Sequence, residues 1–486
     1  MTPALPCGDG IVGAFARLVA RRATDEVVVS PGRRATFGEV DSLSRALCEQ
    51  IAAEPIERGR LVGLAAPNGP AFLAGFLALR RAGQAVLLLD PLAPFEDRRR
   101  ALSVLGTTAV LECKSAWPSS TSDFRLTREG AKPGAEIPRG EIAVVKMTSG
   151  STGVPRGVAM RTEGLLADEA ALVVSMGLRD DDRLLAAIPM SHSYGFTTLA
   201  LSALVRGLAL VLPPDEGPFA PLAAARELGA TVFPTVPAYV HGLLKMSRPP
   251  AWPSVVRLVI SAGAVLPSAL AARFRETLGQ PIHAFYGSSE CGGICYDREG
   301  GAAERGTVGA PVDGVRISLR PLEEDGDGEG LVAVESAAVG ETYLPEADPR
   351  LASGRFETSD VAAWAGGELA LRRRVDRIIN VRGRKVDPSE VERVLAALQG
   401  VEEAVVIGLA SQDRRDEVVR AVVACPSGQL DYEDVAAWCR PRLAEHKVPR
   451  SVVIVDAIPR TPRGKIDRSA LLELRGAEKV PGVADG

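Results

Sequence analysis

The chain has 486 residues, more than one typical hydrophobic core holds, so its length predicts at least two domains. Its formal net charge of −4 leaves no basic excess to release counterions from a phosphate backbone, which argues against a general nucleic-acid binder. Seven scattered cysteines without metal-ligand spacing suit a reducing compartment, and no apolar stretch is long enough to span a bilayer. We therefore expect a cytoplasmic protein.

Short apolar runs alternate with helix-like segments along most of the chain, which predicts an α/β architecture with much parallel sheet. The strand-like runs are 60–66, 84–90, 108–113, 142–147, 208–214, 230–236 and 255–261. Residues 69–83 and 267–279 are predicted helices, because each ends on a glycine where a C-terminal cap belongs. The polar segment 115–140 is predicted to be an irregular connection, and 323–330 an acidic turn between strands.

The pattern changes at about residue 374. Beyond it, the predicted helices are 386–400 and 431–439, and the predicted strands are 402–410, 417–425 and 450–458. These elements form a small α+β unit within the usual size range of a domain. We expect an N-terminal domain over residues 1–374 and a smaller, mobile C-terminal domain over residues 375–486.

Residues 146–158 read KMTSGSTGVPRGV and follow a predicted strand. Glycines let backbone N–H groups point at an anion, and the hydroxyls of Thr148, Ser149, Ser151 and Thr152 add donors. The common phosphate loop needs Gly-Lys-Ser/Thr after four free positions, whereas here Arg156 is followed by glycine. The stretch therefore predicts a phosphate site of another kind. The alternative is a flexible Gly/Ser loop without a ligand.

Further stretches carry side chains suited to a nucleotide. Tyr286 and Glu290, in YGSSE, offer an aromatic face for a purine and a carboxylate for Mg²⁺, which needs few protein ligands. Asp360 follows a loop, where a carboxylate can accept from two ribose hydroxyls. Lys465 stands on a glycine-containing loop near the C-terminus.

The chain resembles the adenylate-forming superfamily of acyl-CoA synthetases, aryl-CoA ligases, peptide-synthetase adenylation domains and luciferases. Seven segments carry the resemblance in order: TSGSTGVPRGV, PMSHSYGF, YGSSE, GTVGAPVDGVRI, TSDV, RRVDRIINVRG and PRTPRGKIDR. The match runs from about Phe37 to Leu474. It implies a large N-terminal α/β domain and a smaller mobile α+β C-terminal domain.

The resemblance also implies an ATP site. The residues implied to wrap the β- and γ-phosphates are Thr148, Ser149, Gly150, Ser151, Thr152 and Gly153. Arg156 is also an implied ATP contact, because it keeps the positive charge where the family usually has lysine. Tyr286 would pack on adenine, Ser289 would contact the α-phosphate and Glu290 would hold Mg²⁺. Asp360 would bind the ribose, and Arg374 follows the last ribose contact.

The same resemblance implies which residues serve the two half-reactions of such enzymes, adenylation of an acid and transfer of the acyl group to a thiol. Asp376 matches the hinge about which the small domain swings, and Lys465 matches the lysine that holds carboxylate and α-phosphate oxygens during adenylation. Gly383 matches the glycine that lines the thiol tunnel, where a side chain would block passage. The basic residues Arg384 and Lys385 would meet phosphates of coenzyme A, or form a solvated charged turn.

The acid site is expected around PMSHSYGF. His192 matches a position beside the acyl site, with a core histidine as the alternative. The amino-acid-activating branch of the superfamily usually carries an Asp here that pairs the α-amine of its substrate. No Asp occurs between Asp182 and Asp215, so the resemblance implies that an α-amino acid is not the substrate. Gly287 stands where acetate-specific relatives carry a bulky Trp, so the acid is expected to be larger than acetate. The candidate pocket residues are His192, Phe196, Tyr239, Ala262, Gly263, Gly287 and Gly293.

These expectations combine into an AMP-forming acid–thiol ligase. It would use ATP and Mg²⁺ to convert a carboxylic acid to an acyl-adenylate and transfer the acyl group to coenzyme A. The alternative is a stand-alone enzyme that loads the acid onto the phosphopantetheine arm of a carrier protein. A third reading, an inactive nucleotide-binding homologue, is motivated by Arg156, Ser359 and Arg373, which depart from the family pattern.

Overall fold

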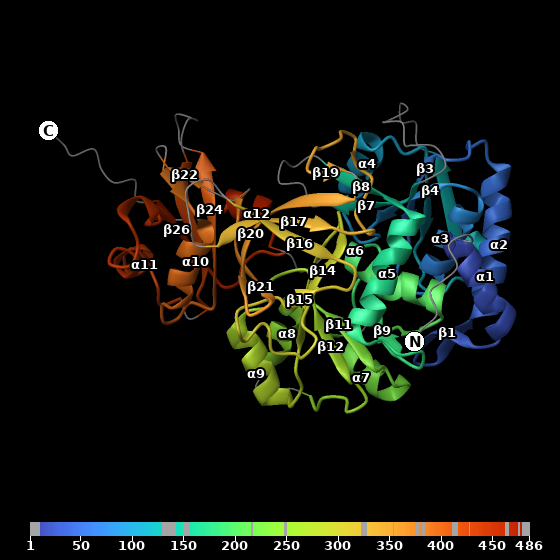
Figure 1. The fold of residues 1–486 in the computed structure, drawn as a ribbon, viewed down its shortest axis with the longest axis horizontal. Helices are drawn as coiled ribbons and strands as arrows, with labels where there is room; N and C mark the ends of the chain where they lie inside the picture. The colour runs from blue at the N-terminus through green and yellow to red at the C-terminus, as the bar shows by residue number, and fades with distance from the viewer. Residues whose placement is uncertain are drawn as a thin grey trace. The chain divides into compact units, whose positions relative to one another are not determined.

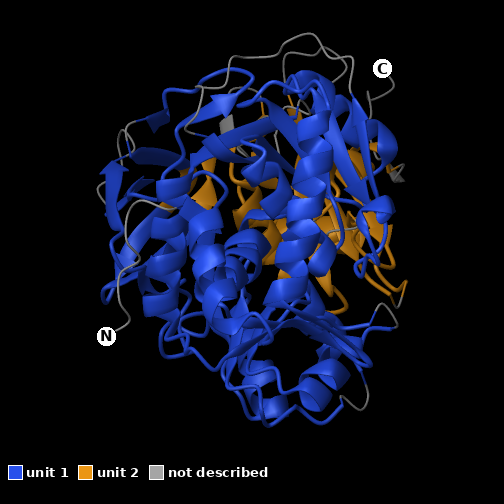
Figure 2. Cartoon of the chain, turned by 90° about the vertical axis from the view of Figure 1, so that its right-hand side faces the viewer, with its two compact units in different colours: residues 1–358, 362–371 blue, residues 359–361, 372–486 orange. Residues whose placement is uncertain are grey.

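The computed structural model describes residues 10–128, 142–148, 155–214, 217–246, 250–321, 328–352, 354–375, 379–381, 384–410, 417–426, 428–461, 466–474 and 477–478; at 380, 384–385, 410 and 477–478 only the backbone is described. Figure 1 shows the ribbon. The chain divides into two compact units, coloured in Figure 2. The first is Met1–Thr358 with Ala362–Leu371, and the second is Ser359–Val361 with Arg372–Gly486. The main division therefore falls close to the predicted boundary at residue 374.

One sheet of the first unit has seven strands among the described residues. Its order is β18 (Thr342–Leu344), β8 (Arg156–Arg161), β7 (Ile142–Thr148), β4 (Ala85–Leu89), β3 (Leu61–Ala65), β5 (Ala109–Cys113) and β6 (Phe124–Arg128). The strands β7, β4, β3 and β5 are parallel, and β8, β18 and β6 are antiparallel to their neighbours. Every residue of β3 and β4 is buried, which explains their continuous apolar sequences.

A second sheet of this unit has nine strands among the described residues. Its order is β15 (Ala310–Pro311), β14 (Gly292–Tyr296), β13 (His283–Ser288), β12 (Leu258–Ser261), β11 (Val232–Thr235), β9 (Arg183–Leu185), β10 (Ala209–Val211), β1 (Glu26–Ser30) and β2 (Arg33–Thr36). The central strands from β13 to β1 are parallel. A third sheet consists of β16 (Arg316–Pro321), β17 (Glu329–Glu335), β20 (Arg355–Ala365), β19 (Leu351–Ala352) and β21 (Glu368–Arg374).

Helices pack on these sheets, as Figure 1 shows for the first unit. They are α1 (Gly10–Arg22), α2 (Phe37–Ala53), α3 (Pro70–Arg81), α4 (Phe95–Val104), α5 (Thr162–Met176), α6 (Ser193–Gly195), the π-helix η2 (Phe196–Arg206), α7 (Ala220–Leu228), α8 (Pro237–Leu244) and α9 (Ser268–Leu278). Thr36 and Glu39 form a capping box that starts α2. No helix among the described residues is both long and apolar enough to cross a membrane.

The second unit is a small α+β assembly. It contains β22 (Ile379–Val381), β23 (Arg384–Val386), α10 (Pro388–Ala396), β24 (Glu403–Ala410), β25 (Glu417–Ala424), α11 (Tyr432–Cys439), η4 (Glu445–Lys447), β26 (Ser451–Val455), α12 (Arg468–Glu473) and β27 (Ala477–Glu478). Helix α10 begins where the side chain of Asp387 accepts from the Ser389 amide at 2.9 Å. Val391, Leu395 and Val435 join the core of this unit.

Most predicted elements have counterparts in the structure, whereas residues 323–327 of the predicted acidic turn lie outside the described residues. The predicted helices 69–83 and 267–279 are α3 and α9, and each predicted apolar strand has a counterpart in the structure. The prediction of an irregular connection over 115–140 is wrong for Phe124–Arg128, which forms β6 against β5. Strand β6 lies at the sheet edge with no buried residue, so its sequence lacks the apolar signal of the central strands.

Candidate active site

The mouth of the predicted phosphate loop is a strand hairpin. Thr148, the last residue of β7, pairs with Arg156, the first residue of β8. The Thr148 hydroxyl also donates to the Arg156 carbonyl oxygen at 3.2 Å. These contacts fix the two ends of the loop. The predicted phosphate ligands Ser149, Gly150, Ser151, Thr152 and Gly153 lie outside the described residues.

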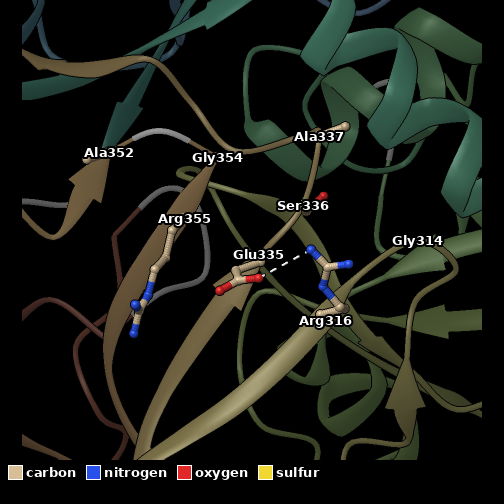
Figure 3. A pocket seen from close by; sticks show the side chains of 8 residues that line it. All are labelled: Gly314, Arg316, Glu335, Ser336, Ala337, Ala352, Gly354 and Arg355. Atoms are coloured by element: carbon tan, nitrogen blue, oxygen red, sulfur yellow. Dashed lines mark hydrogen bonds and ion pairs between the residues drawn. The ribbon is translucent and has the colours of Figure 1, made fainter.

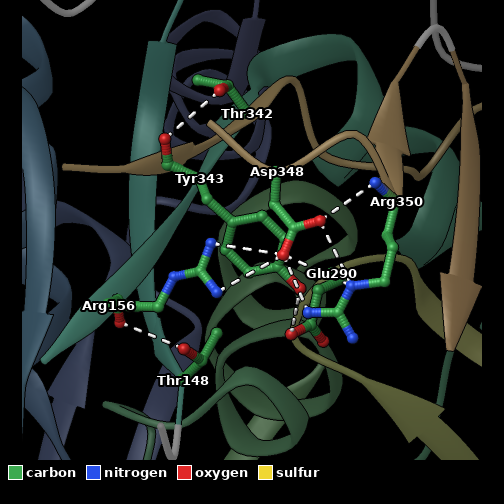
Figure 4. Close-up of polar contacts among 7 residues, drawn as sticks. All are labelled: Thr148, Arg156, Glu290, Thr342, Tyr343, Asp348 and Arg350. Carbon is green, nitrogen blue, oxygen red and sulfur yellow. Dashed lines mark hydrogen bonds and ion pairs between the residues drawn. The ribbon is translucent and has the colours of Figure 1, made fainter. Parts of the chain in front are cut away.

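The side chain of Arg156 lies in a small polar network, drawn in Figure 4. Its guanidinium carbon is 4.2 Å from the centroid of the Tyr343 ring, which is cation–π geometry. Both terminal nitrogens of Arg156 lie 3.5 Å from one oxygen of Asp348. Arg350 binds the same carboxylate at 2.8 Å. Hydrogen bonds from Arg350 lower the pKa of Asp348 to about 2, so this carboxylate is charged at neutral pH.

Tyr343 also reaches Glu290, in the turn between β13 and β14. The Tyr343 hydroxyl donates to Oε1 of Glu290 at 3.0 Å (Figure 4). Burial and the Glu290 charge raise the pKa of Tyr343, so its hydroxyl keeps its proton. The turn is held as well, because the Gly340 amide donates to the Glu290 carbonyl oxygen at 2.7 Å. Arg156 and Glu290, predicted as separate ATP contacts, therefore meet through Tyr343.

The carboxylate of Glu290 has the properties of a magnesium ligand. A carboxylate has about four lone-pair positions, so the Tyr343 bond leaves acceptor capacity for a cation. Among the described residues, no group of three or more His, Cys, Asp or Glu side chains forms a metal cage. Magnesium suits such a site, because it keeps several waters and takes one or two carboxylates together with phosphate oxygens.

The segment PMSHSYGF is tied to the YGSSE turn and to α3. The Ser193 hydroxyl donates to the Ser289 hydroxyl at 2.7 Å, which joins two of the predicted motifs. His192 Nε2 lies 3.9 Å from an oxygen of Asp90, and the imidazole is 26% exposed. The carboxamide of Asn68 binds the loop just before His192 through three hydrogen bonds. The fold thus holds the residue after His192 against Ser289, and both His192 and Ser289 are partly buried.

Four of the predicted acyl-pocket residues also have a structural role that their surroundings explain. Phe196 is completely buried, and its ring lies 6.4 Å from Phe72 and 5.2 Å from Phe76 by centroids. The Tyr239 hydroxyl donates to the Pro218 carbonyl oxygen at 3.1 Å. Ala262 is buried beside the end of β12. Gly263 has a φ of +83°, a conformation that favours glycine whatever the pocket requires.

Gly287 and Gly293 are required by the hairpin that carries Glu290. A Cβ on Gly287 would lie 2.7 Å from the Gly292 carbonyl oxygen, and a Cβ on Gly293 would lie 2.7 Å from a Leu172 methyl carbon. Gly293 also donates its amide to Asp168 at 3.0 Å. The absence of a side chain at Gly287 therefore has a local backbone cause, so it is weaker evidence for a large acid than the sequence indicated.

Lys146 is an unusual residue beside this turn. It lies in β7, is 1% exposed, and its Nζ has no hydrogen-bond partner among the described residues. Burial lowers the pKa of Lys146, and the charges of Asp168, Cys291 and Glu290 oppose that shift. A lysine is therefore buried two residues before Thr148, in surroundings that favour its neutral form.

In the second unit, two predicted nucleotide ligands pair with each other. Arg374 donates to Asp360 at 3.1 Å, and the Asp360 side chain is 14% exposed. Residues Asp376, Gly383 and Lys465 lie outside the described residues, and Arg384 and Lys385 are described only as backbone of β23. Their predicted roles stay predictions.

Two cavities lie away from these residues. One, of about 450 Å³, lies among strands of the first unit (Figure 3) and is lined by Gly314, Arg316, Glu335, Ser336, Ala337, Ala352, Gly354 and Arg355. The other, of about 830 Å³, lies in the second unit beside Trp438. Neither contains a residue predicted for the site, and the first is lined by charged and small side chains without an apolar floor.

Comparison with protein families decides the identity of the fold. Residues 15–344 match the AMP-binding enzyme family, and residues 390–465 match the AMP-binding enzyme C-terminal domain. The chain belongs to the AMP-binding enzyme family. The predictions of this family, of an enzyme, and of a large α/β domain followed by a small α+β domain are confirmed.

Members of the AMP-binding family with assigned names resemble the chain over nearly its whole length. A feruloyl-CoA synthase of Amycolatopsis sp is 29% identical, over 90% of this chain and 93% of the relative. The long-chain-fatty-acid–CoA ligase FadD13 of Mycobacterium tuberculosis is 26% identical, over 94% and 96%. The o-succinylbenzoate CoA synthetase MenE of Bacillus subtilis, solved with its acyl-adenylate, has a TM-score of 0.80 at 23% identity and covers 98% of this chain and 100% of its own.

Sequence reasoning missed several residues of the site. Tyr343 and Asp348 lie between the quoted motifs, and Asp348 is 192 residues from Arg156 in sequence. Asn68 follows β3 in a short Pro-Asn-Gly stretch that reads as an ordinary turn. Of these residues, only Lys146 could have been noticed from the sequence, because a basic residue interrupts an otherwise apolar strand.

Proposed function

We propose that the chain is an ATP-dependent, AMP-forming ligase that joins a carboxylic acid to the thiol of coenzyme A. The observation that carries the proposal is the network joining Arg156, Tyr343 and Glu290 at the mouth of the Ser/Thr/Gly loop, in a chain of the AMP-binding family. This network provides a cation and a carboxylate of the kinds that a triphosphate and Mg²⁺ need. The names of the relatives support the acid and the thiol as co-substrates.

In the first half-reaction, a carboxylate oxygen of the acid attacks the α-phosphorus of ATP. The bond from the α-phosphorus to the bridging oxygen breaks, and pyrophosphate leaves. The chain's part is positioning and charge stabilisation. Arg156 and the loop from Thr148 to Gly153 would bind the leaving phosphates, and Ser289 would contact the α-phosphate. Magnesium held by Glu290 would neutralise the charge that accumulates on the phosphate oxygens.

In the second half-reaction, the thiol attacks the carbonyl carbon of the acyl-adenylate, and AMP leaves as the thioester forms. Lys465 would hold the carboxylate and the α-phosphate in the first step. Asp376 would act as the hinge between steps, and Gly383 would leave room for the thiol. Asp360 and Arg374, which pair in this structure, would bind the ribose side of the nucleotide.

The acid is proposed to be larger than acetate and not an α-amino acid. No Asp occurs between Asp182 and Asp215, the stretch around PMSHSYGF, to pair an ammonium, and a buried ammonium without a partner is costly. Named relatives act on ferulate, on long-chain fatty acids and on o-succinylbenzoate, which are aromatic or long apolar acids. A carrier-protein phosphopantetheine remains the alternative acceptor, since its thiol has the same chemistry as that of coenzyme A.

The decisive experiment measures pyrophosphate release with ATP and Mg²⁺ over a panel of acids, with and without coenzyme A. The panel includes ferulate, o-succinylbenzoate, palmitate, acetate and phenylalanine. We expect release with an aromatic or long apolar acid, and a thioester only when coenzyme A is present. Pyrophosphate release without a coenzyme A thioester, but with a thioester on a holo-carrier protein, would favour the carrier protein as the acceptor. No release with any acid, in protein that binds ATP, would contradict the ligase and favour the inactive homologue.

A further inference from the structure

Tyr343 contacts two charged side chains that come from different parts of the fold. Its ring face lies under the guanidinium of Arg156, and its hydroxyl donates to Glu290. The side chain is only 5% exposed. Tyr343 lies in β18, which pairs with β8, the strand that begins at Arg156. Backbone pairing therefore fixes the ring relative to the arginine that it supports.

Asp348 and Arg350 complete the support. Asp348 lies 3.5 Å from Arg156 but 2.8 Å from Arg350, so most of its charge is directed to Arg350. The charge of Arg156 is therefore only partly balanced by Asp348. Asp348 holds one edge of the guanidinium, and the Tyr343 ring supports one face. An arginine can use both contacts because its guanidinium is planar and stacks on aromatic rings, whereas lysine is a compact point charge.

We propose that Tyr343 is a positioning residue that serves the metal and the phosphates through separate atoms. Its hydroxyl orients the Glu290 carboxylate for Mg²⁺, and its ring orients Arg156 for the outer phosphates of ATP. The inference rests on the proposed function, because it takes Mg²⁺ and ATP as the ligands. It concerns residues that the sequence motifs do not include.

The two roles separate by substitution. Tyr343→Phe removes the hydroxyl and keeps the ring, whereas Tyr343→Leu removes both. We expect Tyr343→Phe to raise the Mg²⁺ concentration for half-maximal ATP binding about ten-fold, as loss of a hydrogen bond to a metal ligand does. Its affinity for ATP in EDTA should stay within about two-fold, since Arg156 keeps the aromatic face. Tyr343→Leu should weaken binding in EDTA by a further factor of about five.

Calorimetry with ATP, without acid or thiol, measures these effects before any catalysis. A cycle with Glu290→Gln tests the connection, because the Mg²⁺ effect of Tyr343→Phe should vanish once the carboxylate is gone. The matched control is Tyr296→Phe. Tyr296 is 2% exposed, and its hydroxyl has no hydrogen-bond partner among the described residues, so its removal should change neither binding constant.

Three outcomes would overturn the inference. Unchanged Mg²⁺ dependence in Tyr343→Phe would refute the role of the hydroxyl. Equal binding in EDTA by the Phe and Leu variants would refute the role of the ring. A parallel loss with and without Mg²⁺ in Tyr343→Phe, together with a lower melting temperature, would indicate a merely structural tyrosine. If the unmodified protein binds no ATP, the proposed function fails first; if it binds ATP and the variants match it, only this inference fails.

Discussion

Asn68 offers a direct test of how the site is held. Its Nδ2 donates to the carbonyl oxygens of Ala186 at 3.1 Å and Ile188 at 2.7 Å, and its Oδ1 accepts from the Met190 amide at 2.8 Å. One side chain therefore holds the loop that leads into His192. We expect Asn68→Ala to release this loop without disturbing the sheets.

The magnitude follows from the three bonds. A net value of about 1 kcal/mol each gives a cost of about 3 kcal/mol for opening the loop, within a range of roughly 2–4. This corresponds to roughly a hundred-fold faster hydrogen exchange at the Met190 amide, which loses its acceptor. The Michaelis constant for the acid should also rise, because His192 lies two residues after Met190.

The assay is hydrogen exchange of residues 186–192 by mass spectrometry, with Gln50→Ala as the control. Gln50 also donates from a side-chain amide, to Thr121 at 2.7 Å, but at an exposed site. Its removal should change the stability by less than about 0.5 kcal/mol. Exchange at Met190 that accelerates less than about three-fold in Asn68→Ala would refute the reasoning, because the three bonds would then contribute almost nothing.

Three further predictions concern single residues. Gly287→Ala should lower the free energy of unfolding by about 1–3 kcal/mol in urea denaturation, because its Cβ would lie 2.7 Å from the Gly292 carbonyl oxygen. Unchanged stability together with a narrower range of accepted acids would instead favour a role of Gly287 in the acyl pocket. Burial lowers the pKa of Lys146, so above that pKa the unfolded chain holds a proton that the folded chain has lost, and stability should rise with pH toward the ordinary value of 10.5. Lys146→Met should flatten that rise in melting temperature between about pH 7 and about pH 10, and an unchanged slope would contradict the assignment. Asp360→Ala should weaken ATP binding about ten-fold by calorimetry, since it removes the proposed ribose acceptor and leaves Arg374 without this carboxylate; unaltered affinity would exclude Asp360 from the nucleotide site.

The sequence predicted the architecture where the physical signal is local. Strands buried on both faces, such as β3 and β4, read as unbroken apolar runs, and helices such as α5 and α9 end on glycine caps. Strand β6 was missed for the opposite reason. It pairs at the sheet edge, keeps its polar side chains in solvent, and has no pattern that separates it from a loop.

The site was predictable only in part. Motifs predicted Arg156 and Glu290 as ATP and Mg²⁺ contacts, and the structure adds the contacts that join these two residues through Tyr343. The motifs did not identify Tyr343 or Asp348, which reach Arg156 only after β18 pairs with β8. Phe196 was predicted from a motif as an acyl-pocket residue, and the structure adds that its ring packs against two aromatic rings of α3.

The charges around Arg156 also bear on the proposed use of Mg²⁺. Asp348 and Glu290 are both acidic, and among the described groups of this network only Arg156 and Arg350 balance them. The network therefore has little net positive charge for binding a triphosphate, although the Arg156 guanidinium and the Glu290 carboxylate are held in fixed orientations. In the proposed function, Mg²⁺ would supply positive charge that these side chains do not, and Lys465 would supply more at the α-phosphate. ATP without a metal should consequently bind weakly here, and the Mg²⁺ dependence of binding should report the orientation of Glu290 more than the total charge of the site.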